Sequence, residues 1–98
     1  MGSFIALAIA LADAHQADIA MTTCFYTQAA ALDDRISSAD VIAEGVASAC
    51  SHQIRDWKYD NYLELRPLDA QTFYRGLDKM VPRMATEIVL RVRAAAKR

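Results

Sequence analysis

The chain has 98 residues and a formal net charge of -1, and 54% of its residues are hydrophobic. A chain of this length builds a single core, and so apolar a composition excludes an intrinsically disordered protein. Its 19 alanines stand against three glycines and two prolines, a balance that favours helices over a turn-rich β fold. We therefore expect one all-α domain, folded as a small helical bundle.

The two ends of the chain carry opposite charge. Residues 1–44 have a net charge of -5 and residues 83–98 a net charge of +4, whereas residues 45–82 are balanced. The asymmetry either stabilises the domain against itself or steers a charged partner. We favour the first explanation, because cations also stabilise the C-terminal end of a helix.

The first 14 residues have features of an export signal. Phe4 to Leu11 form an uncharged apolar run of the length of a signal-peptide core, too short to span a bilayer. Ala12-Asp13-Ala14 then has the small-x-small pattern of a cleavage site, although no Lys or Arg precedes the run. Residues 1–14 are therefore either a signal-peptide remnant or an N-terminal helix, and membrane contact through this apolar segment is compatible with both. Residues 15–98 are expected to form the single helical domain.

Two helices are predicted around a short turn. Apolar residues recur at helical spacing over about residues 18–34 and again over 38–57, with Ser37 or Ser38 as the N-cap of the second helix. Because a short connection makes consecutive helices antiparallel neighbours, we expect a helix hairpin. One buried cluster should join its two helices, formed by Phe25, Leu32, Ile42, Val46 and Trp57.

The remainder of the chain is predicted to form one kinked helix or two helices. Pro67 disfavours a helical conformation at the preceding residue, and Asp69 is suited to cap the helix that follows. Pro82 either kinks that helix or starts another one. The apolar residues of its last part, Met84, Ile88 and Val92, should dock on the hairpin, while its charged residues should remain in water, namely Arg83, Glu87, Arg91 and Arg98.

Cys24 and Cys50 are predicted to form a disulfide. Their midpoint is Ser37, in the predicted turn, so the hairpin brings them to the same height within about one helical turn. Such a crosslink stabilises by about 3 kcal/mol in the chain-entropy model. The alternative is two buried thiols in a cytosolic bundle. The export-like N-terminus favours the disulfide, because disulfides persist in oxidising compartments.

The segment around these cysteines resembles a known group of proteins. Ala31-Leu32-Asp33-Asp34 and the run from Ser38 to Ala43, flanked by Cys24 and Cys50, are similar to small exported helical proteins of proteobacteria. The likeness covers roughly residues 20–52. It implies a helix hairpin and export, and it implies no activity.

No cofactor, metal or catalytic site is predicted. His15 and His52 are isolated, and two cysteines without a CxxC companion do not make a zinc site. Residues 33–44 match an EF-hand loop only at its two ends, because Arg35 stands where an oxygen ligand belongs. On a helix His52 points about 200° away from Cys50, so these two residues cannot form a catalytic dyad. We therefore expect a protein that is not an enzyme.

Two groups of residues are candidates for binding a partner. The first group is the aromatic residues near the end of the second predicted helix, which either bind another chain or belong to the core. The second group is the cations of the last helical turns. Because the overall charge is close to zero, nucleic acid is an unfavoured partner and a protein is the favoured one. The candidate residues are Trp57, Tyr59, Tyr62, Arg91, Arg93, Lys97 and Arg98.

The leading interpretation is a small non-enzymatic protein, periplasmic or secreted, that binds an unidentified macromolecule or serves as a structural module. The alternative is a cytoplasmic or phage-type helical adaptor that oligomerises through its N-terminal helix. The redox state of the two cysteines separates these interpretations, because cytosolic thiols are kept reduced.

Overall fold

The computed structural model describes the backbone of residues 2–97 and the side chains of residues 16–97. It contains four helices, and no strand occurs in the part of the backbone that is described. The predicted all-α class is therefore correct. The helices are α1 (Gly2–Leu32), α2 (Ala39–Ala49), α3 (Ser51–Leu65) and α4 (Ala70–Ala96).

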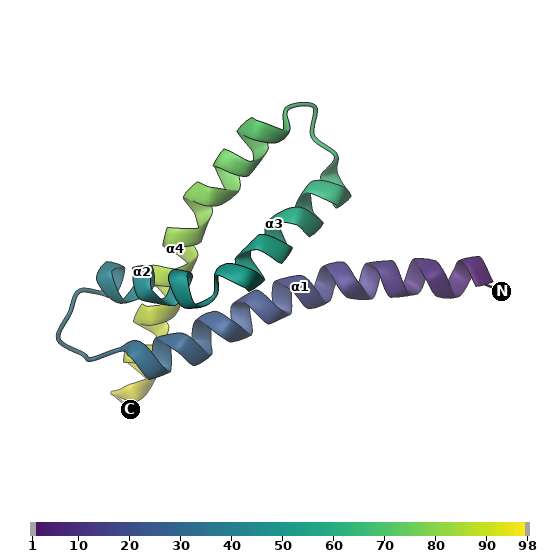
Figure 1. The fold of residues 1–98 in the computed structure, drawn as a ribbon. Coiled ribbons are helices and arrows are strands. Elements are labelled where there is room, and N and C mark those ends of the chain that lie inside the picture. The colour runs from purple at the N-terminus through teal and green to yellow at the C-terminus, as the bar shows by residue number, and fades with distance from the viewer. Residues whose placement is uncertain (1, 98) are drawn as a thin grey trace.

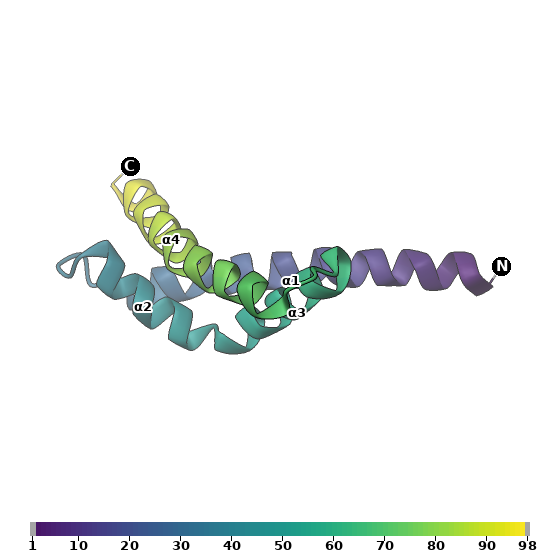
Figure 2. The same ribbon diagram turned by 90° about the horizontal axis from the view of Figure 1, so that it is seen from above.

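The helices pack around the C-terminal half of α1. After the turn that follows α1, α2 returns beside it, and α3 continues along α1 before the chain reverses into α4 (Figure 1). α4 then crosses back and packs against both α2 and α1. The N-terminal half of α1 extends beyond the other three helices in both views (Figures 1 and 2).

The second predicted helix is in fact two helices, so the expected span 38–57 is wrong. α2 ends at Ala49 and α3 begins at Ser51, with Cys50 between them at φ -102° and ψ 20°. The physical reason is that the two parts pack on different neighbours: α2 packs mainly against α4, and α3 packs mainly against α1. A straight helix through Cys50 could not follow both.

The end of α3 and the start of α4 follow the local chemistry of the sequence. Arg66, just before Pro67, has the left-handed conformation at φ 43°, and its N–H donates to the Tyr62 carbonyl. The Asp69 carboxylate then accepts hydrogen bonds from the Thr72 N–H at 3.2 Å and from the Thr72 hydroxyl at 2.7 Å. The predicted N-cap is thus correct. Pro82 lies inside one continuous α4, so the C-terminal part is one helix and not two.

The core combines residues from all four helices. Phe25, Ile42, Val46 and Trp57 are buried as predicted, but Leu32 is 43% exposed and its predicted burial is wrong. Leu32 ends α1 and lies over Gly45, which has no side chain to cover it. The buried residues are Met21, Phe25, Ala29, Ile42, Ala43, Val46, Cys50, Ile54, Trp57, Leu77, Val81, Ala85, Ile88 and Val89.

The last part of α4 docks as expected from its apolar stripe. Ile88 is buried, and Met84 and Val92 are partly buried against the core. The charged residues Arg83, Glu87 and Arg91 are exposed, and Arg98 lies outside the described residues. α4 therefore supplies the layer that covers α1 and α2.

We predict that Ile42→Ala lowers the free energy of unfolding by about 2–5 kcal/mol, because Ile42 is 8% exposed and truncation leaves a cavity. Ile36→Ala is a matched control at a residue that is 91% exposed, and it should cost less than about 0.5 kcal/mol. Urea unfolding followed by circular dichroism measures both. Equal effects of the two substitutions would contradict the assigned core.

Candidate binding site

A disulfide joins α1 to the junction between α2 and α3. The Sγ atoms of Cys24 and Cys50 are 2.09 Å apart and their Cα atoms 6.0 Å apart, as the sequence predicted for a bonded pair. Cys50 is fully buried in the core, and Cys24 is partly buried against it. The crosslink therefore holds the chain where α2 and α3 diverge.

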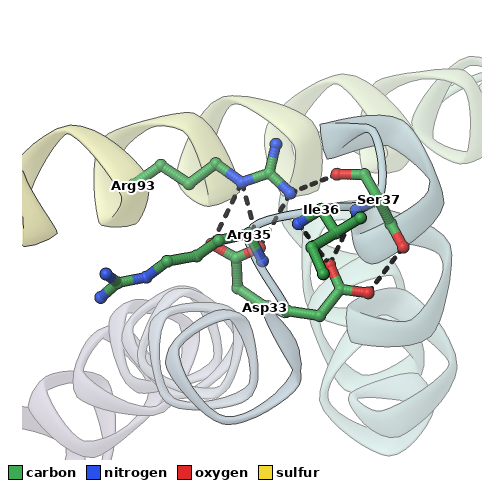
Figure 3. A network of polar contacts seen from close by, with 6 residues as sticks. Asp33, Arg35, Ile36, Ser37 and Arg93 are labelled. Carbon is green, nitrogen blue, oxygen red and sulfur yellow. Dashed lines mark hydrogen bonds and ion pairs between the residues drawn. The ribbon is translucent and has the colours of Figure 1, made fainter.

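A second link joins the C-terminal part of α4 to the turn between α1 and α2 (Figure 3). The Arg93 guanidinium donates to both oxygens of Asp33, from Nε at 3.0 and 3.1 Å and from Nη2 at 2.8 Å. Nη2 also donates to the Ser37 carbonyl. The Asp33 side chain is only 5% exposed, so water is largely excluded from this ion pair. The hydrogen bond from Arg93 is the main cause that lowers the pKa of Asp33.

The turn itself is fixed by the neighbouring carboxylate. Asp34 accepts hydrogen bonds from the Ile36 N–H at 2.9 Å, the Ser37 N–H at 2.8 Å and the Ser37 hydroxyl at 2.7 Å. The bond from the Ser37 hydroxyl contributes most to lowering the pKa of Asp34 to about 2. Ser38 occupies the N-cap position of α2, without a capping hydrogen bond from its side chain. Ser37 therefore stabilises the turn and does not cap α2.

The candidate cations are used differently from what we expected. Arg93 donates to Asp33 in an internal ion pair, so its guanidinium already has a partner within the fold. Arg91 is exposed and bonds Glu87 at 2.6 Å and the Tyr26 hydroxyl at 3.3 Å. Lys97 is exposed, and Arg98 lies outside the described residues. The opposite charges of the two chain ends thus meet inside one fold, which is the explanation that the sequence favoured.

The aromatic candidates also separate into different roles. Trp57 is 7% exposed and belongs to the core, in agreement with the core interpretation of the aromatic residues. Tyr62 is partly buried and stacks on Tyr74 with ring centroids 5.6 Å apart, an arrangement that joins α3 to α4. Lys58 and Asp78 add an ion pair of 2.8 Å between the same helices. Tyr59 is different, because 55% of it is exposed.

Tyr59 lines an open groove of about 380 Å³ between α1 and α3. The groove is of the size at which small ligands and short chain segments bind. Its polar groups are amides, carboxylates and the Tyr59 hydroxyl, and Asp56 is 3.4 Å from both His52 and Arg55 on the same helix. The other lining residues are Gln16, Ala17, Ala20, Gln53 and Asp60. The geometry suits a segment that offers hydrogen-bond donors and an apolar face for the tyrosine ring.

Sequence reasoning named Tyr59 and missed the rest of this groove. A signal was present, because Asp56, Tyr59 and Asp60 stand at i, i+3 and i+4 and so share one face of α3. Gln16 and Ala20 are also one turn apart, on α1. What the pattern could not provide was the packing of α3 along α1, which brings these two faces together.

The structure offers no arrangement for metal or thiol chemistry among its described residues. No group of three or more His, Cys, Asp or Glu residues in the described part of the chain is placed to hold a metal ion. Asp33 is the first residue of the EF-hand-like stretch, and its carboxylate is bound by the Arg93 guanidinium. Cys50 is bonded to Cys24 and so provides no thiolate beside His52. Within the described residues, no helix is long and apolar enough to cross a membrane.

Comparisons with protein-family models, with curated proteins and with solved structures found no match. The resemblance to exported helical proteins of proteobacteria therefore stays a prediction from the sequence.

Acid titration tests the turn. Because Asp34 has a folded-state pKa of about 2, below its ordinary value of 3.8, its ionised form stabilises the fold at neutral pH. That contribution is lost as the pH falls from 3.8 through about 2. We expect Asp34→Asn to be less stable than the wild type at pH 7 and to lose less stability over this window. Glu44→Gln is the control, and identical titration curves for wild type and Asp34→Asn would contradict the role of Asp34.

The ion pair between α4 and the turn is tested by Arg93→Lys. Lysine keeps the charge but cannot donate to both Asp33 oxygens and the Ser37 carbonyl from one planar group. We therefore predict a lower melting temperature for Arg93→Lys than for Arg91→Lys, whose arginine is 60% exposed. Differential scanning calorimetry measures both. A larger loss at Arg91 would show that the Arg93 ion pair does not hold the turn.

Proposed function

We propose that the protein is a small non-enzymatic helical module that is exported, to the periplasm or the medium, and binds another macromolecule there. A protein is the partner that its nearly neutral charge favours over nucleic acid. The observation that carries the proposal is the disulfide between Cys24 and Cys50.

The disulfide supports export because such bonds persist in oxidising compartments and are reduced in the cytosol. Cys50 is buried at the junction of α2 and α3, so the bond is part of the core and not a surface crosslink. The apolar run and the small-x-small pattern before His15 point to the same compartment from an independent part of the chain.

The groove between α1 and α3 is the binding site that we propose for the partner. Tyr59 offers an exposed aromatic ring, which is the residue type enriched among energetically dominant contacts. Asp56 and Gln53 offer acceptors and donors beside it. Arg91 and Lys97, near the C-terminal end of α4, do not line this groove and are not needed for this mode of binding.

The second candidate function is a cytoplasmic or phage-type adaptor that oligomerises through its N-terminal helix. The observation that favours it is the length of α1, whose N-terminal half extends beyond the body formed by the other helices (Figure 2). In this alternative residues 1–14 remain attached and pair with another copy.

Fractionation and mass spectrometry distinguish the two functions. We expect the protein in the exported fraction to lack residues 1–14 and to resist alkylation before reduction, because Cys24 and Cys50 are bonded. A fusion of residues 1–20 to a reporter that is active only after export should be active. Two freely alkylated cysteines in a full-length cytoplasmic protein would overturn the proposal and favour the adaptor.

Affinity capture tests the groove. A protein recovered from the exported fraction with the wild type should be lost with Tyr59→Ala, because truncation removes the exposed ring. Leu90→Ala is the control, at a residue on α4 with a similar exposed fraction of 52%. Equal recovery by all three proteins would exclude the groove as the binding site.

A further inference from the structure

Exposed apolar side chains gather at the end of the molecule where α1 and α2 are joined. Leu32 is 43% exposed, Ile36 91% and Val41 52%. Leu32 reaches over α2, because its Cδ1 lies 3.5 Å from the position that a Cβ of Gly45 would occupy. Gly45 is one helical turn after Val41 and lies on the same exposed side of α2. We refer to Leu32, Ile36, Val41 and Gly45 as the α1–α2 face.

The most exposed member of this face is held in place by polar contacts. Asp34 binds the Ile36 N–H, and Arg93 fixes both sides of the turn through Asp33 and the Ser37 carbonyl (Figure 3). An apolar side chain on a fixed turn loses little conformational freedom when a partner covers it. Ile36 is thus presented to solvent on a turn whose backbone is held by hydrogen bonds on both sides.

Gly45 makes the centre of the face flat. A Cβ at this position would meet Leu32 at an ordinary contact distance of 3.5 Å, so the fold itself has room for alanine. Glycine in a helix is less stable than alanine, and α2 has only 11 residues. What glycine does provide is close access to the helix backbone between two apolar side chains.

Negative charge borders the face on one side. With about 100° per residue along α2, Asp40 and Glu44 lie on one side of Val41, and Gly45 and Leu32 lie on the other. Asp40 and Glu44 are both exposed. Two copies joined through this face by a two-fold axis perpendicular to α2 would bring their Asp40 and Glu44 side chains together, and this opposes such an antiparallel homodimer. A partner with cations along one edge would instead be attracted.

We propose that the α1–α2 face binds an amphipathic helix of a partner protein, with apolar residues on Leu32, Val41 and Gly45 and a row of Lys or Arg along Asp40 and Glu44. This inference rests on the proposed function as a protein-binding module and adds a surface separate from the groove at Tyr59. A helix laid on exposed apolar positions is a common mode of protein recognition, and it requires both the apolar contact and the matching charge.

The test uses the full-length oxidised protein, labelled with ¹⁵N, and a synthetic helical peptide of about 18 residues with Leu and Ala on one face and Lys on the other. We expect the peptide to shift the amide resonances of Leu32, Ile36, Val41 and Gly45. A scrambled peptide of equal composition and a peptide with Glu in place of Lys should bind more weakly by about fivefold or more.

Variants distinguish binding at the α1–α2 face from nonspecific electrostatic attraction of the Lys peptide to the protein. Glu44→Lys and Gly45→Gln should each weaken binding of the Lys peptide by about fivefold, through lost charge pairing and through lost close approach. Gly76→Gln is the matched control, because Gly76 is an exposed helical glycine of α4 with nothing within 4 Å. Circular dichroism confirms that each variant is folded.

Several results would overturn the inference: no binding at millimolar peptide, equal binding of the scrambled peptide, equal loss with Gly76→Gln, or shifts centred on Tyr59 and Asp56. These outcomes are independent of export. Reduced cysteines in the cytoplasm would defeat the proposed function and leave the peptide result in place. Failure of the peptide to bind the folded, oxidised protein would defeat the docking surface and leave the disulfide and export untouched.

Discussion

The rest of the fold depends on the covalent link between Cys24 and Cys50. It ties the C-terminal half of α1 to Cys50, the residue at which α2 ends and α3 begins, so a single bond connects three helices. A chain of 98 residues buries a small core, and at this size a crosslink is a substantial part of the total stability. Phe25 of α1, Val46 of α2 and Val89 of α4 are fully buried in the core that these helices form.

An ion pair and the hydrogen bonds beside it connect α4 to the turn between α1 and α2, which the disulfide does not reach. Arg93 reaches from α4 to Asp33, and Asp34 organises the turn beside it, so charges from opposite ends of the sequence meet at one place. The arrangement leaves Ile36 exposed on a turn that its own polar contacts hold rigid. Stability at this end of the molecule is therefore compatible with an apolar surface that faces water.

Much of this fold could be predicted from the order of residues. The helical class and the cap at Asp69 follow from local patterns, and the pairing of Cys24 with Cys50 follows from their equal sequence distance from the predicted turn. The break at Cys50 could not be predicted in this way, because it depends on tertiary packing: α2, before Cys50, packs mainly against α4, and α3, after it, packs mainly against α1. Tertiary packing overrides the helical pattern there.

The candidate site was less predictable than the fold. Tyr59 was identified by its type, but its groove is formed only where α1 and α3 pack together, with Gln16 from α1 and Asp56 from α3 among the lining residues. Arg93 was named as a candidate for binding a partner because it is one of the cations of the last helical turns, whereas in the structure it contacts Asp33, 60 residues earlier in the chain. Contacts at such separation have no local pattern from which they can be inferred.

That separation also orders events during synthesis. Asp33 leaves the ribosome 60 residues before Arg93, and Cys24 leaves it 26 residues before Cys50. The turn therefore cannot acquire its last hydrogen bonds until α4 has been made, however early α1 and α2 become helical. A chain interrupted before α4 would therefore lack the cation that the Asp33 carboxylate and the Ser37 carbonyl bind.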